Sequence, residues 1–346
     1  MANTGNRQQR EFYDLTYYGR ARRLREMGKL VLERYPVRVK QIRLLTIETN
    51  GIFRVDTEDG TRYMLRISDP KNTHEEAEIR SEIAWLNALI RETDLRIPAP
   101  VLNTMGEFVN AVQMEGIPKK RFCVLFSWIQ GKDLAQQITP QNLSLLGEVT
   151  ARLHEHARQF QPPPDFRVRT MDSVFPYADP SFEEVEPVIL FEKDLQPVVS
   201  PEQRRIFQRG AELVQQEIDR LYNSAEPLSV LHGDLHQWNV KIYRGQLAVL
   251  DFEDLMWGYP IQDIGTTWMY FFEEPGAQEL RRAYREGYER ILPWPERYQG
   301  QLEIMVAARV FNLVNYILNS PVPEDQQIAP DYVKRSVKRL KELLPL

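Results

Sequence analysis

The sequence predicts an α+β protein in two parts, a small sheet-rich part followed by a larger and mainly helical one. Up to about residue 130, short apolar runs bounded by turn residues indicate strands. Beyond Gly131, apolar residues recur at the three- and four-residue spacing that is typical of helices. The chain has 346 residues, which is enough for one large domain or two of ordinary size.

Five strands are expected in the first part, at residues 41–47, 52–57, 62–67, 108–113 and 121–129. Asp59-Gly60 is a turn signal between the second and third strands, because both residues tolerate the positive φ of a tight hairpin. A helix is expected at residues 74–92, and its apolar face should pack on the sheet through Ile79, Ile83, Leu86 and Ile90. The Arg-rich residues 1–35 are also expected to be helical.

Helices are expected to dominate the second part. Thr139-Pro140 is a helix start, since Thr caps the first turn and Pro fits the first helical position. The Pro-rich residues 161–200 are expected to be irregular, and a helix is expected at 201–223. The remaining elements are expected to be a short strand at 230–232, a hairpin around Arg244-Gly245 made by strands 240–243 and 247–252, and three helices between 275 and 344.

Composition narrows the class of protein. The net charge is −5, which gives no indication of a general affinity for nucleic acid. The single cysteine, Cys123, excludes an intrachain disulfide and lies in an apolar run, so a buried thiol is expected. Residues 1–10 are polar and lack the apolar core of a signal peptide. No stretch approaches the roughly 20 apolar residues of a membrane helix. The expected location is therefore the cytoplasm, without a membrane partner.

The chemistry is concentrated between residues 232 and 252. Asp234 follows a glycine at the end of an apolar strand, Asn239 lies five residues further on, and Asp251 follows another strand. Two carboxylates and one amide oxygen are a set that phosphoryl transfer needs, because one carboxylate accepts the proton of the attacking hydroxyl. The other oxygens hold Mg²⁺ against the phosphates of a nucleotide. Catalysis is then mostly positioning and charge neutralisation.

The pattern His232-Gly233-Asp234-x-x-x-x-Asn239, followed by Asp251-Phe252-Glu253, resembles the aminoglycoside phosphotransferase/choline kinase family, distant relatives of protein kinases. The resemblance covers roughly residues 40–320. It implies a protein-kinase-like fold, with a small lobe of antiparallel sheet plus helix and a larger, mainly helical lobe. ATP and Mg²⁺ are the implied cofactors, with Asp234 as catalytic base and Asn239 and Asp251 as Mg²⁺ ligands.

Two neighbouring residues refine this resemblance. Glu253 stands where protein kinases have the Gly of Asp-Phe-Gly, and small-molecule kinases of the family often carry an acidic residue there. Asp263 matches a structural Asp that braces the catalytic loop, although a simple helix cap is the alternative reading. Three regions are therefore expected: a helical extension at 1–35, and the two lobes that the resemblance implies, a nucleotide-binding lobe at 36–130 and a catalytic and acceptor-binding lobe at 131–346.

The nucleotide-binding residues are matched less sharply. Arg66 occupies the position of the strand Lys that holds the α- and β-phosphates, and Glu82 on the following helix is its expected partner. An ordinary surface ion pair is the alternative. The loop before the second strand has only one Gly, so Asn50 is assigned the phosphate contact. The hinge, whose backbone would meet adenine, is assigned to Ser127, Trp128 and Ile129.

The acceptor is expected to be a hydroxylated small molecule. Residues 176–195, here called the acidic insert, hold six acidic residues against Lys193 alone: Asp179, Glu183, Glu184, Glu186, Glu192 and Asp194. With Glu273 and Glu274 they suggest a cationic acceptor, although a solvated acidic loop is an alternative. Two other functions remain open: a bacterial Ser/Thr protein kinase of the same fold, and a non-catalytic pseudokinase that serves as a binding module.

The remaining histidines and aromatics have plainer interpretations. His154 and His156 lie two apart on a helix, so they should face different ways and be solvent-facing or half-buried. His236 either contacts the phosphates or the acceptor, or packs the catalytic loop. Core packing is favoured over a ligand cage for a four-residue aromatic cluster: Trp268, Tyr270, Phe271 and Phe272.

Overall fold

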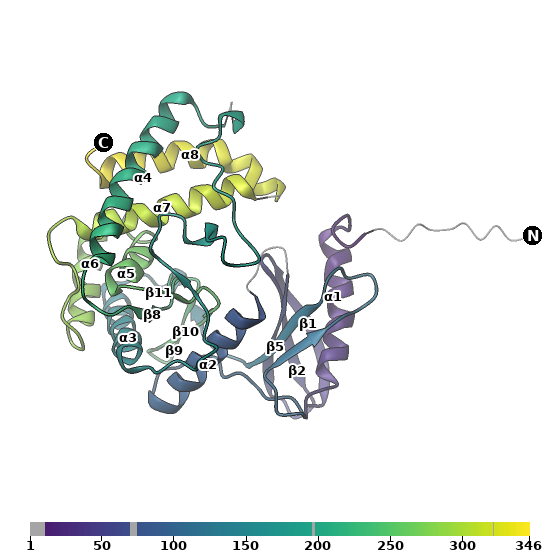
Figure 1. Ribbon diagram of the computed structural model, residues 1–346. Coiled ribbons are helices and arrows are strands. Elements are labelled where there is room, and N and C mark those ends of the chain that lie inside the picture. Colours follow the sequence, from purple (N-terminus) through teal and green to yellow (C-terminus); the bar gives the residue numbers. More distant parts are fainter. Residues whose placement is uncertain (1–10, 70–74, 196–197, 321) are drawn as a thin grey trace, which may run out of the picture. The chain divides into compact units, whose positions relative to one another are not determined.

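The computed structural model describes residues 11–69, 75–195, 198–320 and 322–346 (Figure 1). Residues 1–10, on which the expectation of no signal peptide rests, lie outside the described residues, as does His74. The chain forms two compact units. The first unit comprises Met1–Asn87 with Pro98–Ile129, and the second comprises Ala88–Ile97 with Gln130–Leu346.

The first unit is built on an antiparallel sheet in the order β1-β2-β3-β5-β4. All five predicted strands are confirmed, with ends within two residues of those expected. Their bounds are β1 Val39–Ile47, β2 Asn50–Thr57, β3 Arg62–Ser68, β4 Val109–Val112 and β5 Arg121–Ser127. The predicted turn between β2 and β3 is present, but only Gly60 takes a positive φ, of 85°.

One face of this sheet is covered by α1 (Tyr17–Leu32), which lies inside the predicted N-terminal extension (Figure 1). Leu24, Met27 and Val31 of α1 join an apolar cluster with side chains of β2, β3 and β5. Cys123 belongs to the same cluster with 0% exposure, so the prediction of a buried thiol is confirmed. Burying one such aliphatic side chain contributes about 1.5–3 kcal/mol. The helix is therefore part of the core of the first unit.

The opposite face of the sheet presents a charged side chain, that of Arg66. Side chains alternate along a strand, so Arg66 points away from the α1 cluster that contains its neighbours Leu65 and Ile67. The predicted helix is α2 (Glu76–Glu92), with Ile79, Ile83 and Leu86 buried as expected. Ile90 is 40% exposed instead, so the predicted apolar face ends one turn before the helix does.

Two small sheets in the second unit frame the catalytic loop. One has the order β10-β9-β6 and the other β7-β11-β8. Their strands are β6 Lys132–Asp133, β7 Arg169–Thr170, β8 Ser229–Leu231, β9 Val240–Tyr243, β10 Gln246–Val249 and β11 Met256–Gly258. The predicted hairpin of β9 and β10 is confirmed, with Arg244 and Gly245 at φ values of 51° and 77°. Both values suit a tight two-residue turn.

Helices make up most of the rest of the second unit. They are α3 Pro140–Gln159, α4 Pro201–Tyr222, α5 Pro260–Trp268, α6 Ala277–Tyr288, α7 Gln301–Asn319 and α8 Pro323–Leu343, with short 3₁₀ helices at Leu134–Gln136, Pro176–Ala178 and Lys193–Leu195. The Thr139 side chain caps α3 by accepting a hydrogen bond from the Asn142 backbone at 3.2 Å, as predicted. The three predicted C-terminal helices are confirmed as α6, α7 and α8. The sequence analysis missed α5, which has only nine residues.

Close packing of α3 and α6 depends on glycine. A Cβ at Gly147 would lie 1.9 Å from the Tyr284 carbonyl oxygen, and a Cβ at Gly287 would lie 1.8 Å from that of Ser144. The backbone of each helix therefore occupies the space that a side chain at the glycine of the other helix would fill, and this lets the two backbones pack together. Among the described residues, no helix is long and apolar enough to cross a membrane.

Candidate active site

The catalytic loop, residues 232–239, joins the buried strand β8 to β9. Gly233 turns the chain with a φ of 78°. A Cβ at this position would lie 2.0 Å from the carbonyl oxygen of Asp254, so only glycine fits. The turn brings the backbone of Asp234 out of β8 beside the segment that follows β10.

Asp263 holds the start of this loop from the first turn of α5. Its Oδ1 accepts a hydrogen bond from the Gly233 backbone at 3.0 Å, and its Oδ2 accepts one from the His232 backbone at 3.3 Å. The carboxylate is completely buried. Burial alone would raise the pKa of Asp263, but the hydrogen bond and charge of His154 and the hydrogen bond from the Gly233 backbone lower it below its usual value. The bracing contact implied for Asp263 is therefore present.

His154 on α3 completes the arrangement around Asp263. Its Nε2 lies 3.1 Å from Asp263 Oδ2, and its Nδ1 lies 2.9 Å from the Tyr288 hydroxyl on α6. His156 points elsewhere, and its Nε2 lies 2.9 Å from Glu92. The expectation that both histidines are solvent-facing or half-buried was wrong, since they are 1% and 8% exposed. Both histidines are buried because they bind residues that are distant in sequence, which a local pattern does not reveal.

His232 ties the catalytic loop to the strand before Asp251. Its Nε2 donates to the Leu250 carbonyl at 3.0 Å, and its Nδ1 accepts from the Asp234 backbone at 3.3 Å. This pattern requires the neutral ring with the proton on Nε2. Burial lowers the pKa of His232, although the charge of Asp263 opposes the shift. The ring therefore stays neutral and acts as a structural link.

Both oxygens of the Asp234 carboxylate have donors. Oδ2 accepts from Asn239 Nδ2 at 3.3 Å and lies 3.2 Å from His236 Nε2. His236 accepts a backbone hydrogen bond from Trp238 through Nδ1, so its Nε2 carries the proton and donates to Asp234. Oδ1 accepts from Nη2 of Arg309, which lies on α7. His236 thus contacts the carboxylate directly.

Asn239 and Asp251 offer oxygen atoms from adjacent backbone segments, because the Leu250 backbone donates to the Asn239 carbonyl at 2.8 Å. Asn239 directs Nδ2 to Asp234. Its Oδ1 accepts no hydrogen bond from any part of the chain that the structure describes. Asp251 is exposed and has a φ of 61°, a backbone conformation that is uncommon for non-glycine residues.

This donor set suits Mg²⁺ better than a metal that needs a full protein cage. The described residues contain no group of three or more His, Cys, Asp or Glu side chains placed to hold a metal. Mg²⁺ usually takes one or two carboxylates, and phosphates and water supply its other ligands. An amide oxygen and one carboxylate from neighbouring segments therefore fit that ion.

In the first unit, Arg66 and Glu82 form the expected pair. Arg66 Nη1 donates to Glu82 Oε1 at 3.0 Å, and its Nη2 pairs with Oε2. The surface alternative was wrong, because Arg66 is 6% and Glu82 3% exposed. The guanidinium also lies over the Phe126 ring, 5.2 Å from its centre. A bidentate buried pair fixes the orientation of Arg66 on β3.

The residues assigned to the phosphate loop and the hinge also lie in the first unit. Asn50 is the first residue of β2 and is buried. The Ser127 backbone donates to Ala99 at 2.8 Å, and that of Trp128 donates to Arg62 at 3.3 Å. The Ile129 backbone N–H has no hydrogen-bonding partner within the described ranges. Of the three residues assigned to the hinge, Ile129 is therefore the one whose backbone N–H is not used within the described ranges.

One residue of the predicted aromatic cluster, Tyr270, lies beside the catalytic loop instead of in the core. Tyr270 leaves the predicted cluster, and its ring lies 4.6 Å from that of His236 and 6.0 Å from that of Trp238. Trp238 is 56% exposed, a large fraction for an indole. Trp268 and Phe271 are buried core residues, as predicted. The loop of residues 232–239 therefore exposes one aromatic side chain, that of Trp238.

The acidic insert is less negative than its own residues suggest. Arg167 and Arg169, just before it in sequence, lie 4.5 and 4.2 Å from the Phe182 ring centre and donate to insert carbonyls. Glu186 is bound by Asn315, and burial raises the pKa of its carboxyl group. Glu273 pairs with Arg339, which lowers the pKa of Glu273. Arg167 and Arg169, which lie outside residues 176–195, thus offset part of the negative charge of the acidic insert.

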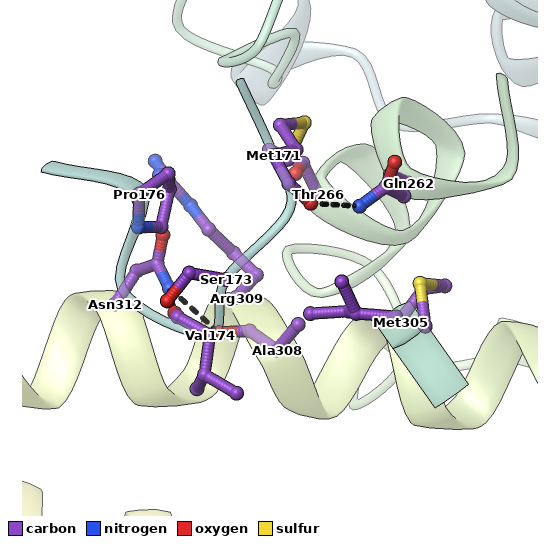
Figure 2. A pocket seen from close by; sticks show the side chains of 11 residues that line it. Met171, Ser173, Val174, Pro176, Gln262, Thr266, Met305, Ala308, Arg309 and Asn312 are labelled. Carbon is purple, nitrogen blue, oxygen red and sulfur yellow. Dashed lines mark hydrogen bonds between the residues drawn. The ribbon is translucent and has the colours of Figure 1, made fainter. Parts of the chain in front are cut away.

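A small cavity lies next to Arg309 (Figure 2). It measures about 20 Å³, and Met171, Ser173, Gln262, Thr266 and Asn312 are among its lining residues. Figure 2 shows the Arg309 side chain leaving α7 toward Pro176. Such a volume accommodates about one water molecule. The cavity is therefore too small to bind an acceptor.

Residues 46–300 match the phosphotransferase enzyme family, and the chain belongs to that family. It is accordingly a kinase-type phosphotransferase, with the mixed helix-and-sheet fold that the sequence predicted. The family assignment covers β2 to β5, the catalytic loop and α3 to α6.

Individual relatives are distant. Hydroxylysine kinase of Bos taurus is 24% identical over 227 residues, which cover 61% of this chain and 58% of that enzyme, less than two thirds of its length. The microcompartment-associated aminopropanol kinase superimposes with a TM-score of 0.74 at 20% identity, covering 92% of this chain and 96% of the other. An amicoumacin kinase in complex with AMP-PNP, Ca²⁺ and Ami gives 0.73 at 16% identity, with coverages of 92% and 97%. At these identities the two structures show a shared fold.

The buried brace yields a first prediction. Asp263→Asn leaves one of two backbone N–H donors facing an amide NH₂, so unfolding of the second unit should require about 1–3 kcal/mol less free energy at pH 7. Because the folded chain lowers the pKa of Asp263, the carboxylate contributes fully above the unfolded carboxyl pKa of about 4. Its contribution is lost as the pH falls below that value. Denaturant unfolding between pH 3 and 7 should therefore show the wild type and variant converging in acid.

Asp331→Asn is the matched control, because the Asp331 side chain is 86% exposed and, among the described residues, its ion pair is with Lys334 alone. Such exposed pairs contribute about 0–1 kcal/mol. Equal stability of Asp263→Asn and the wild type at pH 7 would contradict the bracing role.

Proposed function

We propose that this protein transfers the γ-phosphoryl group of Mg·ATP to a hydroxyl group of a small-molecule acceptor, with Asp234 as the catalytic base. The observation that carries the proposal is the braced catalytic loop, in which Asp234 lies beside Asn239 and one backbone hydrogen bond links Asn239 to the segment of Asp251. Membership of the phosphotransferase family supports it. So do the relatives named for hydroxylysine, aminopropanol and amicoumacin, one of them bound to AMP-PNP.

Asp234 accepts the proton of the acceptor hydroxyl as its oxygen attacks the γ-phosphorus. A new P–O bond forms to the acceptor, the bond between the γ-phosphorus and the bridging oxygen breaks, and ADP leaves with that oxygen. Asn239 and Asp251 would hold Mg²⁺, which neutralises phosphate charge when bound. Asp263 and His232 keep the loop in place, so that little reorganisation accompanies the reaction.

The nucleotide is assigned to residues of the first unit. Arg66 would bind the α- and β-phosphates while Glu82 orients it, and Asn50 would contact the phosphates from the start of β2. Ile129 would donate its backbone N–H to adenine, and Ser127 and Trp128 support it through their bonds to Ala99 and Arg62. An arginine can serve here because its planar fork binds carboxylate on one side and retains further donors.

We further assign an amine to the acceptor. Trp238, which is 56% exposed and lies next to His236, offers a π face close to the base, and such a face attracts an ammonium group by about 0.5–2 kcal/mol. The exposed carboxylate of Glu183 and the net charge of −5 add long-range attraction. The relatives named above include an amino alcohol kinase and an amino acid kinase. Arg167 and Arg169 reduce the contribution of the insert, so Trp238 is the main support.

Asp234→Asn tests the base. The variant keeps the shape of the side chain but removes the charge that accepts the proton, and such assistance is typically worth about 10²–10⁴-fold. We expect kcat to fall by that order while the affinity for ATP stays close to that of the wild type. Coupled ATP-consumption kinetics and calorimetry measure the two quantities. Wild-type turnover in the variant would falsify the assignment.

A panel of matched alcohols tests the acceptor. Each amino alcohol is paired with a neutral counterpart, for example 1-amino-2-propanol with 1,2-propanediol, and phosphorylation by Mg·ATP is followed. We expect the amine of at least one pair to be strongly preferred. Its KM should rise with salt, because exposed charges are screened over about 8–10 Å at physiological ionic strength. Preference for neutral or anionic alcohols would end the amine assignment and leave phosphotransfer standing.

Calorimetry with Mg·ATP, metal-free ATP and adenosine tests the nucleotide site. Asp251→Ala should remove the affinity that Mg²⁺ adds to ATP, because one of two protein ligands is lost. Arg66→Ala should weaken ATP far more than adenosine. Since that change leaves Glu82 buried without its partner and is destabilising, Arg66→Lys provides a second variant that keeps the charge.

Asp165→Ala, in an exposed loop, is the control for the metal variant. Undiminished Mg·ATP binding by Asp251→Ala contradicts the metal assignment. Equal losses of ATP and adenosine in both Arg66 variants would indicate a purely structural role for that arginine.

A further inference from the structure

Arg309 is a buried cation that points at the catalytic base from a distant helix. It lies in the middle of α7, its side chain is 10% exposed, and its Nη2 donates to Asp234 Oδ1. The same nitrogen donates to the Tyr270 hydroxyl at 3.0 Å. Burial opposes the charge of Arg309, but Asp234 raises the pKa of the guanidinium well above its usual value. Arg309 therefore remains a cation at any pH at which the protein folds.

The two carboxylate oxygens of Asp234 are bound by different residues. Arg309 occupies Oδ1, whereas Asn239 and His236 meet Oδ2. Donors on both oxygens fix the plane of the carboxylate, which Asn239 and His236 alone would leave free to rotate. A carboxylate has about four lone-pair positions, so it still accepts the hydroxyl of an acceptor.

The rest of α7 links this contact to the acidic insert. Asn312, Asn315 and Asn319 follow Arg309 along α7, and their spacing places the three of them on one stripe of the helix, next to Arg309. Asn312 donates to the Val174 carbonyl, Asn315 binds Glu186, and Asn319 donates to the Pro187 carbonyl at 2.8 Å. One helix thus holds both the base and the backbone of the segment around residues 174–187.

We propose that Arg309 is a positioning residue for phosphoryl transfer, which holds Asp234 Oδ1 so that the carboxylate faces the acceptor hydroxyl. The role rests on the proposed function, since it acts through Asp234. Tyr270 orients Arg309 in turn, through the hydroxyl that shares Nη2 with the carboxylate. The Nε atom of Arg309 is buried and has no hydrogen-bonding partner among the described residues.

The test is steady-state kinetics on the panel alcohol that the wild type phosphorylates fastest. Arg309→Ala should lower kcat by about 10²-fold, a loss typical of a misplaced catalytic group, with the KM for ATP nearly unchanged. Millimolar guanidinium chloride should restore part of that kcat. Tyr270→Phe should lower kcat in the same direction by about 3- to 10-fold. Arg335→Ala, which removes an exposed arginine from α8, should leave kcat within about twofold.

Arg309→Lys covers the case in which the alanine variant does not fold, because it keeps the charge and loses the planar fork; a loss of about tenfold in kcat is expected. A folded Arg309→Ala or Arg309→Lys variant with wild-type kcat overturns the positioning role while phosphotransfer stands. A loss confined to the KM for ATP overturns it equally. A wild-type chain that phosphorylates no alcohol of the panel overturns the proposed function and this role together.

Discussion

The buried carboxylate of Asp263 is the contact on which the catalytic region depends. It is the first acidic residue of α5, and it satisfies the backbone N–H groups of His232 and Gly233. A buried carboxylate is costly unless its oxygens are hydrogen-bonded, and here His154 supplies the remaining donor. His154 is itself held by the Tyr288 hydroxyl. The Asp263 carboxylate and its partners therefore connect the three helices α3, α5 and α6. The glycines that bring α3 and α6 together serve the same end.

The first unit uses the same physical device with a different result. Arg66 and Glu82 are both buried and bidentate, so each satisfies the other. Such a pair contributes little net stability, because desolvation offsets the Coulomb attraction. What it provides is orientation: the guanidinium cannot leave the face of β3 opposite α1 without stranding Glu82. In both units, then, a buried charge fixes the geometry of a residue to which chemistry is assigned.

The sequence predicted what is local and missed what is distant. All five strands of the first sheet, the cap at Thr139 and the β9–β10 hairpin follow from patterns within about ten residues. Asp234, Asn239 and Asp251 were found because their spacing is itself a local pattern. Arg309, His154 and Tyr288 were not connected to the site, because 75, 80 and 54 residues separate them from Asp234 and only the fold brings them together.

Some of these omissions had a signal in the sequence. Arg309 is the one basic residue in the otherwise apolar and neutral stretch from Ile304 to Asn319. A lone arginine in such a helix has to find a buried partner, and the partners most in need of a cation are the carboxylates of a catalytic loop. The acidic insert misled for the opposite reason. Its charges were counted within a window, whereas Arg167 and Arg169 lie just outside the window and fold back onto it.

The polar face of α7 suggests how one scaffold can serve different acceptors. Asn312, Asn315 and Asn319 hold carbonyl groups and one buried carboxyl of residues 174–187, and these contacts depend little on which side chains the segment exposes. Substitutions on the exposed side of the insert therefore leave its backbone anchored. Arg309, on the same helix, contacts the base and the Tyr270 hydroxyl. Acceptor recognition can thus change through exposed side chains of the insert while the geometry of Asp234 is preserved. Both the insert backbone and Asp234 are held by contacts from the same helix, α7.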